Sequence, residues 1–201
     1  MVVISAAVEG LVDETVIKSL INEAGAVTGH VYGKKGKPSL RASIAGYNNA
    51  AKFRPWVVLI DLDQDASCAP ELCHNWIANK GAKLCFRVAV RAIESWLLAD
   101  RESIAKFLSV AQSRIPINPE SEPNPKHVMV DLAARSTRRS IREDMVPRPG
   151  SGRSVGPAYT SRLIEFVQSS LWRPKTAAER SQSLRGCRRC LERLVQGELE
   201  D

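Results

Sequence analysis

The sequence predicts an α/β fold in which a mainly parallel, four-stranded sheet is flanked by helices and followed by a helical, arginine-rich C-terminal extension. Two observations lead to this prediction. Four short apolar runs alternate with segments of helical periodicity, the pattern of right-handed crossovers in a parallel sheet. The third run, residues 56–60, is wholly apolar and leads directly into Asp61, Asp63 and Asp65. Such a run is typical of a buried strand that carries acid to the edge of a sheet.

The first strand is predicted at residues 2–8, where an apolar stretch ends at Glu9 and Gly10. Apolar side chains then recur at helical spacing through residues 11–24, with Asp13 in the first turn, where the helix dipole favours an acid. A strand followed at once by a helix begins the alternation.

The alternation continues through the next three apolar runs. They predict strands at 26–32, 56–62 and 83–90. Helical periodicity predicts helices at 39–51, 70–80 and 92–100, the last continuing, after a break, through 104–108.

The C-terminal half is predicted to be helical between irregular loops. Four prolines make residues 111–126 an irregular segment. Helices are expected at 127–143, 158–171 and 176–196, with a long glycine- and proline-containing loop before the second of them. We therefore predict an α/β core at 1–110, a proline-rich loop at 111–126 and a helical basic extension at 127–201 packed on the core.

The net charge of +7 is concentrated near the C-terminus. Residues 135–201 carry 14 Lys and Arg against 8 Asp and Glu, and all but Lys175 of these cations are arginine. The arginine fork suits bidentate contacts with phosphate, so nucleic acid is the expected partner. A solvated helical face with salt bridges is the alternative explanation.

Other bulk properties exclude several classes of protein. No apolar run approaches the length of a membrane span, and the N-terminus lacks the features of a signal peptide, so we expect a soluble cytoplasmic protein without a membrane partner. Five cysteines, an odd number, predict free thiols in a reducing compartment. Two of them form a C-x-x-C at positions 187 and 190, which also suits two neighbours on one helix face, and we expect no structural zinc.

The predicted topology brings several charged residues to one edge of the sheet. All strands of a parallel sheet end at the same edge, which is where open α/β sheets bind ligands. Glu9, the loop that begins at Gly33, Asp61 with Asp63, and Glu94 each follow a predicted strand. These residues are therefore expected to share an edge.

Clustered carboxylates at a sheet edge predict a divalent-metal site, because like charges this close need a cation or a proton between them. Mg²⁺ prefers oxygen ligands, and Mn²⁺ is the expected substitute. Glu9, Asp61 and Asp63 are the predicted ligands of a first ion. Asp13 and Glu94 are candidates for a second.

Each acid also has a purely structural explanation. Asp13, Glu14 and Glu94 can complement helix N-termini, and Asp65 can cap a turn. Asp65 and Glu14 are therefore only outer members of the predicted site. The apolar run before Asp61 weakens the structural explanation for that residue and for Asp63.

Glu9-Gly10 after the first strand, Asp13 four residues from Glu9, and Asp61-x-Asp63 after the third strand resemble the TOPRIM superfamily. That superfamily includes topoisomerases, primases, recombination proteins and OLD-type nucleases. Residues 8–14 look most like OLD-type and small stand-alone TOPRIM-like proteins. Residues 92–100 are similar to a segment of an uncharacterised TOPRIM-like family often found beside ATPase genes. The resemblance covers about residues 1–100 and implies a Rossmann-like core with a divalent metal.

The resemblance implies a metal-dependent nuclease that cuts or nicks DNA or RNA, with Glu9, Asp61, Asp63 and Glu94 as catalytic residues. It also suggests a role in anti-phage defence beside an ATPase partner, and a homodimer is left open. The predicted contacts with the nucleic-acid backbone lie in two flexible basic segments and are Lys34, Lys35, Lys37, Arg148 and Arg153. The first segment lacks P-loop spacing, so no nucleotide cofactor is expected. The alternative function is a non-catalytic nucleic-acid-binding or partner-binding TOPRIM subunit.

Overall fold

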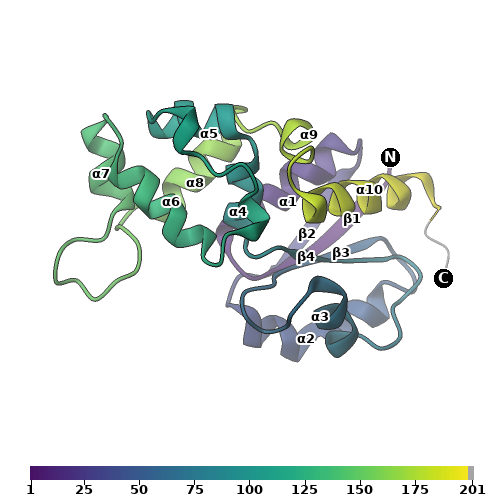
Figure 1. Ribbon diagram of the computed structural model, residues 1–201. Helices are drawn as coiled ribbons and strands as arrows, with labels where there is room; N and C mark the ends of the chain where they lie inside the picture. The colour runs from purple at the N-terminus through teal and green to yellow at the C-terminus, as the bar shows by residue number, and fades with distance from the viewer. Residues whose placement is uncertain (199–201) are drawn as a thin grey trace. The chain divides into compact units, whose positions relative to one another are not determined.

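The computed structural model describes residues 1–198 and divides the chain into two compact units (Figure 1). The first comprises Met1–Val90 together with the C-terminal segment from Ser183, and the second comprises Arg91–Gln182. The predicted boundaries at residues 110 and 126 both fall inside the second unit. The C-terminal helix therefore belongs to the first unit, although it follows the second along the chain.

A parallel four-stranded sheet forms the centre of the first unit, which confirms the predicted α/β class. In the order β2-β1-β3-β4, its strands are Val27–Gly33, Val3–Val8, Trp56–Asp61 and Leu84–Ala89. The two central strands, β1 and β3, are each apolar except for one residue, as expected for strands that helices cover on both faces. Their carboxyl ends consequently lie side by side at one edge of the sheet.

Helices of the first unit flank the sheet on both faces (Figure 1). α1 and α10 lie on one face, and α2 and α3 lie on the other. Their bounds are Leu11–Glu23, Gln182–Gln196, Lys37–Ala50 and Ala69–Trp76. On the α2 and α3 side, alternate β3 residues Val58 and Ile60 pack in a fully buried cluster with Leu40, Leu72 and Phe86. Burying each large apolar side chain contributes about 1.5–3 kcal/mol, so this cluster anchors the strands that carry the acids.

The C-terminal helix α10 is fastened to the sheet by covalent and ionic contacts. Cys190 forms a disulfide with Cys85 of β4, so the prediction of free thiols is wrong for this pair. Arg188 forms an ion pair with Glu23 of α1 at 3.0 Å. The two cysteines are 105 residues apart in sequence, and nothing in the local pattern indicates their pairing.

The second unit consists of short helices. In chain order they are α4 Ile93–Ala99, α5 Arg101–Leu108, η1 Gln112–Arg114, η2 Pro119–Ser121, α6 Pro125–Ala134, α7 Arg139–Met145, α8 Tyr159–Gln168 and α9 Pro174–Ala177. The predicted helix at 127–143 is interrupted between α6 and α7, where the Ser136 hydroxyl accepts a hydrogen bond from the backbone N–H of Arg138. Serine competes with the helix for backbone groups in this way, which accounts for the break.

Asp100 joins α4 to α5 and also binds the segment that precedes α9. Its carboxylate caps α5 by accepting from the Ser103 backbone N–H, and it accepts three hydrogen bonds from Arg173, from the backbone N–H, Nε and Nη2, at 2.7–3.0 Å. The residue is only 1% exposed. Burial raises the pKa of Asp100, but the hydrogen bonds from Arg173 and Ser103 outweigh it and leave that pKa below its usual value.

No helix among residues 1–198 is both long enough and apolar enough to cross a membrane.

Candidate functional site

The acids of the first unit meet at the carboxyl ends of the two central strands. Glu9 directly follows β1, and Asp61 is the last residue of β3. The Asp61 backbone N–H donates to Glu9 Oε1 at 2.8 Å. This bond holds the Glu9 carboxylate against the end of β3, because neighbouring parallel strands finish at the same level.

Asp13 lies behind this edge, on the buried face of α1. Its side chain is almost fully buried, with 6% of the residue exposed. A Cβ at Gly10 would lie 3.0 Å from Asp13 Oδ2, so glycine at this turn leaves room for the carboxylate. Asp13 is close enough to Glu9 to favour the protonated form of that carboxyl.

Lys37, at the start of α2, places its ammonium among the acidic side chains at this edge of the sheet. Its Nζ donates to the backbone carbonyl of Asp61 at 2.8 Å, to Asp63 Oδ2 at 2.6 Å and to Asp65 Oδ2 at 2.8 Å. Glu9 Oε1 lies 3.8 Å from the same nitrogen. The edge therefore surrounds one cation with oxygen atoms. We call Glu9, Asp13, Asp61, Asp63 and Asp65 the acidic edge.

The turn after β3 differs from the extended strand end that the sequence predicts. The strand ends at Asp61, and Asp63 adopts the left-handed conformation with φ 49°. Aspartate tolerates this conformation better than most residues. The turn closes with a hydrogen bond from Asp65 N–H to Leu62 O at 3.2 Å. Asp63 and Asp65 are thus brought to the same ammonium by a turn and not by strand alternation.

Burial is the main reason why the pKa of Glu9 is raised to about 7. The Asp61 N–H and the positive charge of Lys37 oppose this rise, while Asp13 and Asp63 add to it. A carboxyl group with a pKa near neutrality can exchange a proton under physiological conditions, as a general acid or base must.

The loop from Gly33 to Gly36 holds Lys37 in place through an unusual backbone conformation. Gly33, Lys34 and Gly36 all have positive φ angles, of 88°, 69° and 82°. The loop is fixed to the acidic edge by hydrogen bonds from Lys34 N–H to Val8 O at 2.9 Å and from Gly36 N–H to Glu9 O at 3.0 Å. The strand end and the loop therefore form one hydrogen-bonded structure.

Gly33→Ala is expected to disrupt this loop. An added Cβ would lie 2.2 Å from the carbonyl oxygen of Val8, at a positive φ that L side chains rarely adopt. We expect the free energy of unfolding to fall by about 2 kcal/mol or more, measured by urea denaturation. Gly25→Ala is the matched control, because Gly25 has a similar φ of 81° with nothing within 4 Å, and strain alone costs about 1 kcal/mol. Equal losses in the two variants would contradict a close approach at Gly33.

Two other residues predicted for this site lie near it. Glu14 forms ion pairs with Lys18 at 2.8 Å and with Lys34 at 3.4 Å, on the outer side of α1. Lys35 is exposed and forms no ion pair among the residues that the structure describes. Of the three loop lysines predicted to contact nucleic acid, Lys35 alone is exposed without an ion pair among the described residues.

Glu94 belongs to the second unit, where it is buried in α4. The Tyr159 hydroxyl donates to Glu94 Oε1 at 3.1 Å. Burial, followed by the charge of Glu94, raises the pKa of Tyr159 well above its usual value. The neutral Tyr159 hydroxyl is therefore a hydrogen-bond donor to Glu94 within the second unit. The role of Glu94 in metal binding stays a prediction.

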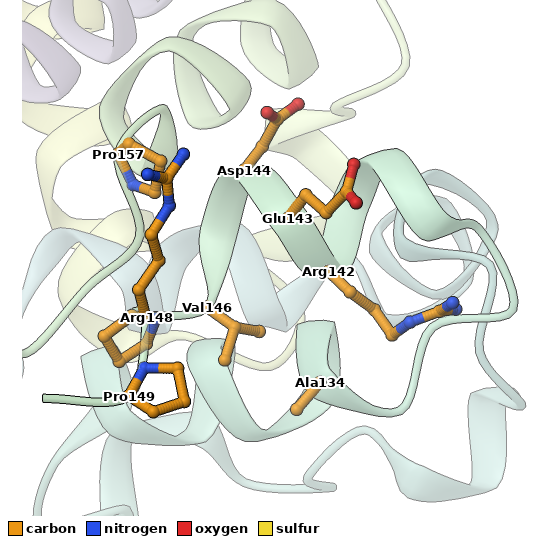
Figure 2. A pocket seen from close by; sticks show the side chains of 9 residues that line it. Ala134, Arg142, Glu143, Asp144, Val146, Arg148, Pro149 and Pro157 are labelled. Carbon is orange, nitrogen blue, oxygen red and sulfur yellow. The ribbon is translucent and has the colours of Figure 1, made fainter.

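Arg148 lines a pocket of about 630 Å³ in the second unit (Figure 2). Arg142 and Arg148 extend in different directions, and three prolines form rigid parts of the wall (Figure 2). Arg142 donates to the backbone carbonyl of Ser136, whereas Arg148 is exposed. Arg153 lies in the exposed loop after the pocket. Both residues predicted to contact nucleic acid are thus accessible.

The oxygen atoms at the acidic edge suit a hard cation such as Mg²⁺. Among residues 1–198, no three His, Cys, Asp or Glu side chains are already arranged as a metal site. At the acidic edge the Lys37 ammonium takes the central position, and its oxygen partners face it. The donor set fits a metal chemically, and Lys37 would have to give way for one to bind.

Sequence reasoning placed Glu9, Asp61 and Asp63 correctly at one edge but did not find the role of Lys37. A lysine five residues beyond the expected end of β2 looks like any solvated loop lysine. Its contact with Asp63 and Asp65 depends on the turns that precede α2 and follow β3.

No protein-family model, no curated protein and no solved structure matches the chain. The resemblance of its motifs to the TOPRIM superfamily therefore remains a prediction.

Proposed function

We propose that the protein is a metal-dependent phosphodiesterase of the TOPRIM type that cuts or nicks nucleic acid. The observation that carries the proposal is the acidic edge itself. It lies where parallel sheets bind ligands, and its oxygen atoms already surround a positive charge at 2.6–2.8 Å. Oxygen atoms that surround one positive charge are suited to hold a divalent cation, and such a cation can assist the cleavage of a phosphodiester.

Glu9, Asp61 and Asp63 would hold the metal, with Asp13 behind them. When bound, a magnesium ion would supply Lewis acidity toward the oxygens of a phosphodiester. Without a metal, burial raises the pKa of Glu9 to about 7 and the charge of Lys37 opposes that rise. A bound cation would oppose it in the same way and keep the Glu9 carboxylate ionised as a ligand. Lys37, released from Asp63 and Asp65, would be free to neutralise a phosphate oxygen of the substrate. The exposed side chains of Lys35, Arg148 and Arg153 are proposed to contact the sugar–phosphate backbone of the nucleic acid.

A cleavage assay tests this function. Supercoiled plasmid and single-stranded DNA and RNA oligonucleotides are incubated with the protein and Mg²⁺ or Mn²⁺, with EDTA as the control. We expect nicked or shortened products that require the metal. Failure of the wild-type protein to cut any substrate with either ion, also in the presence of a partner ATPase, would contradict the proposal.

Lys37→Met is expected to strengthen metal binding. The substitution keeps the length of the side chain but removes the charge that competes for Asp63 and Asp65. We expect Mn²⁺ to bind roughly tenfold more tightly, a change of about 1.4 kcal/mol, measured by isothermal titration calorimetry. Lys35→Met is the matched control, because Lys35 lies on the same loop without an ion pair among the described residues. Weaker or unchanged binding by Lys37→Met would show that the lysine does not compete with the metal.

Lys37 also supports the second candidate function, a non-catalytic nucleic-acid-binding or partner-binding subunit. An internal lysine that neutralises the acids can serve structure alone, as a buried or half-buried ion pair often does. That function predicts that Lys37→Met destabilises the fold and that millimolar Mg²⁺ does not restore the loss.

A further inference from the structure

The segment from the end of α1 to the last apolar residue of β3 contains no acidic residue. From Ala24 to Ile60 there is no Asp or Glu, while six cations occur: Lys34, Lys35, Lys37, Arg41, Lys52 and Arg54. The segment forms β2, α2 and β3, and Lys34 and Lys35 directly follow β2, at the end of the strand that lies beside the acidic edge. The exposed charge of Lys35 can attract a polyanion.

An aromatic cluster lies on the same part of the fold. The ring of Tyr32 on β2 stacks at 5.4 Å on Trp56 of β3, with an interplanar angle of 28°, and lies 5.9 Å from Tyr47 of α2. His30 lies 4.3 Å from Tyr32 on the outer side of the cluster. Tyr47 and Trp56 also stack on each other at 5.3 Å, so three rings contact one another and His30 extends the cluster along the edge strand.

Within this cluster, exposure to solvent increases from Trp56 toward the edge strand. Trp56 is 8% exposed, whereas Tyr32 is 41% exposed and His30 is also exposed. Packing against Trp56 and Tyr47 fixes the Tyr32 ring but leaves part of it open to solvent. A ring held rigidly from behind and open in front loses little entropy when a planar ligand stacks on it.

The aromatic cluster also lies close to the acidic edge, measured along the strands. Tyr32 is paired in register with Ala7, two residues before Glu9. At about 3.3 Å per residue, that separation is roughly 7 Å along the strands, close to the length of one extended nucleotide. Lys35 follows Tyr32 by three residues and carries an exposed charge.

We propose that His30 and Tyr32 form a stacking platform for the unpaired bases of a single-stranded nucleic acid, with Lys35 contacting the adjacent phosphate. This proposal rests on the proposed function and names its substrate class. Bases in a duplex stack on each other and are closed to protein rings, whereas bases in a single strand stack readily on aromatic side chains. A base stacked on Tyr32 would place a neighbouring phosphodiester within reach of the acidic edge.

Fluorescence anisotropy with labelled 12-nucleotide oligo(dT), oligo(U) and a 12-base-pair duplex tests the platform. The titrations are done in EDTA, so that no cleavage is required. We expect the single strands to bind more tightly than the duplex, and Tyr32→Ala to weaken single-strand binding about tenfold or more. Tyr32→Phe keeps the ring and should bind like the wild type. The comparison of oligo(dT) with oligo(U) shows whether DNA or RNA is preferred.

Phe53→Ala is the matched control, because Phe53 is an aromatic residue of the same unit that is 73% exposed but precedes β3, at the opposite end of the strands. It should leave binding unchanged. Equal affinity of Tyr32→Ala and the wild type, or equal binding of duplex and single strand, would overturn the platform. Single-strand binding that depends on Tyr32 without any metal-dependent cleavage would instead reject the proposed function and leave the platform intact. A circular-dichroism spectrum and a melting curve for each variant identify any loss of folding.

Discussion

The double variant Asp61→Asn/Asp63→Asn is expected to lose metal-dependent cleavage by more than about 100-fold. Each amide keeps the shape of the side chain but removes a charged metal ligand, and loss of several kcal/mol of electrostatic stabilisation corresponds to a rate loss of this size. Asparagine is chosen because it also tolerates the left-handed conformation of Asp63, with φ 49°. Initial rates on supercoiled plasmid at fixed Mg²⁺ measure the effect.

The backbone contacts of Asp61 with Glu9 and Lys37 should persist in this variant, since they use its N–H and carbonyl groups. The fold of the edge is therefore expected to survive. Glu14→Gln, on the outer side of α1, is the matched control and should retain cleavage. Equal cleavage by the wild type and the double variant would show that the acidic edge is not the catalytic site.

The largest expected effect on stability is at Asp100 in the second unit. Asp100→Ala removes the cap of α5 and the bonds to Arg173, and leaves the groups around a fully buried carboxylate without their acceptor. Hydrogen bonds to a charged group contribute about 1.5–3 kcal/mol and a cap about 1 kcal/mol. Because Arg173 is 43% exposed and solvent screens part of the pair, we expect a total loss of about 3 kcal/mol in urea denaturation at pH 7.

The contribution of Asp100 should also depend on pH. Its pKa is lower in the folded protein than in the unfolded chain, so the folded protein binds fewer protons there. The stabilisation is therefore fully present above the unfolded pKa of about 3.9 and is lost as the pH falls through the folded value. The difference between the wild type and Asp100→Asn should therefore be constant above about pH 4 and shrink as the pH falls below it.

Glu143→Ala is the control for this series, because the Arg139–Glu143 pair at 2.7 Å is exposed. Solvent screens such a pair, so the free energy of unfolding should hardly change. A loss at Asp100 as small as that at Glu143 would contradict the proposed role of Asp100 in joining α4, α5 and the segment before α9.

The sheet could be predicted because each of its strands is marked by local features. The apolar run at Trp56–Ile60 indicates a strand buried on both faces, and the alternation of strands with helices indicates parallel pairing. Parallel pairing in turn places Glu9 and Asp61 at one edge. This step needs only the direction of the strands, which is why it succeeded without knowledge of side-chain contacts.

The remaining features depend on contacts between distant residues. The Cys85–Cys190 disulfide and the return of α10 to the sheet join segments about half the chain apart, and no local pattern records them. The position of Lys37 depends on positive φ angles at Gly33 and Gly36. A glycine in the sequence shows that a positive φ angle is allowed at its position. It does not show where the side chain of the next residue will point.

Binding of Mn²⁺ at equilibrium tests most directly whether the acidic edge is a metal site. Electron paramagnetic resonance of free Mn²⁺ in a titration with the wild-type protein should reveal a saturable site, and the Asp61→Asn/Asp63→Asn variant should lose it. Lys37→Met should bind more tightly than the wild type in the same experiment. Absence of saturable binding by the wild-type protein, or equal binding by the double variant, would contradict the proposal that Glu9, Asp61 and Asp63 hold a catalytic metal.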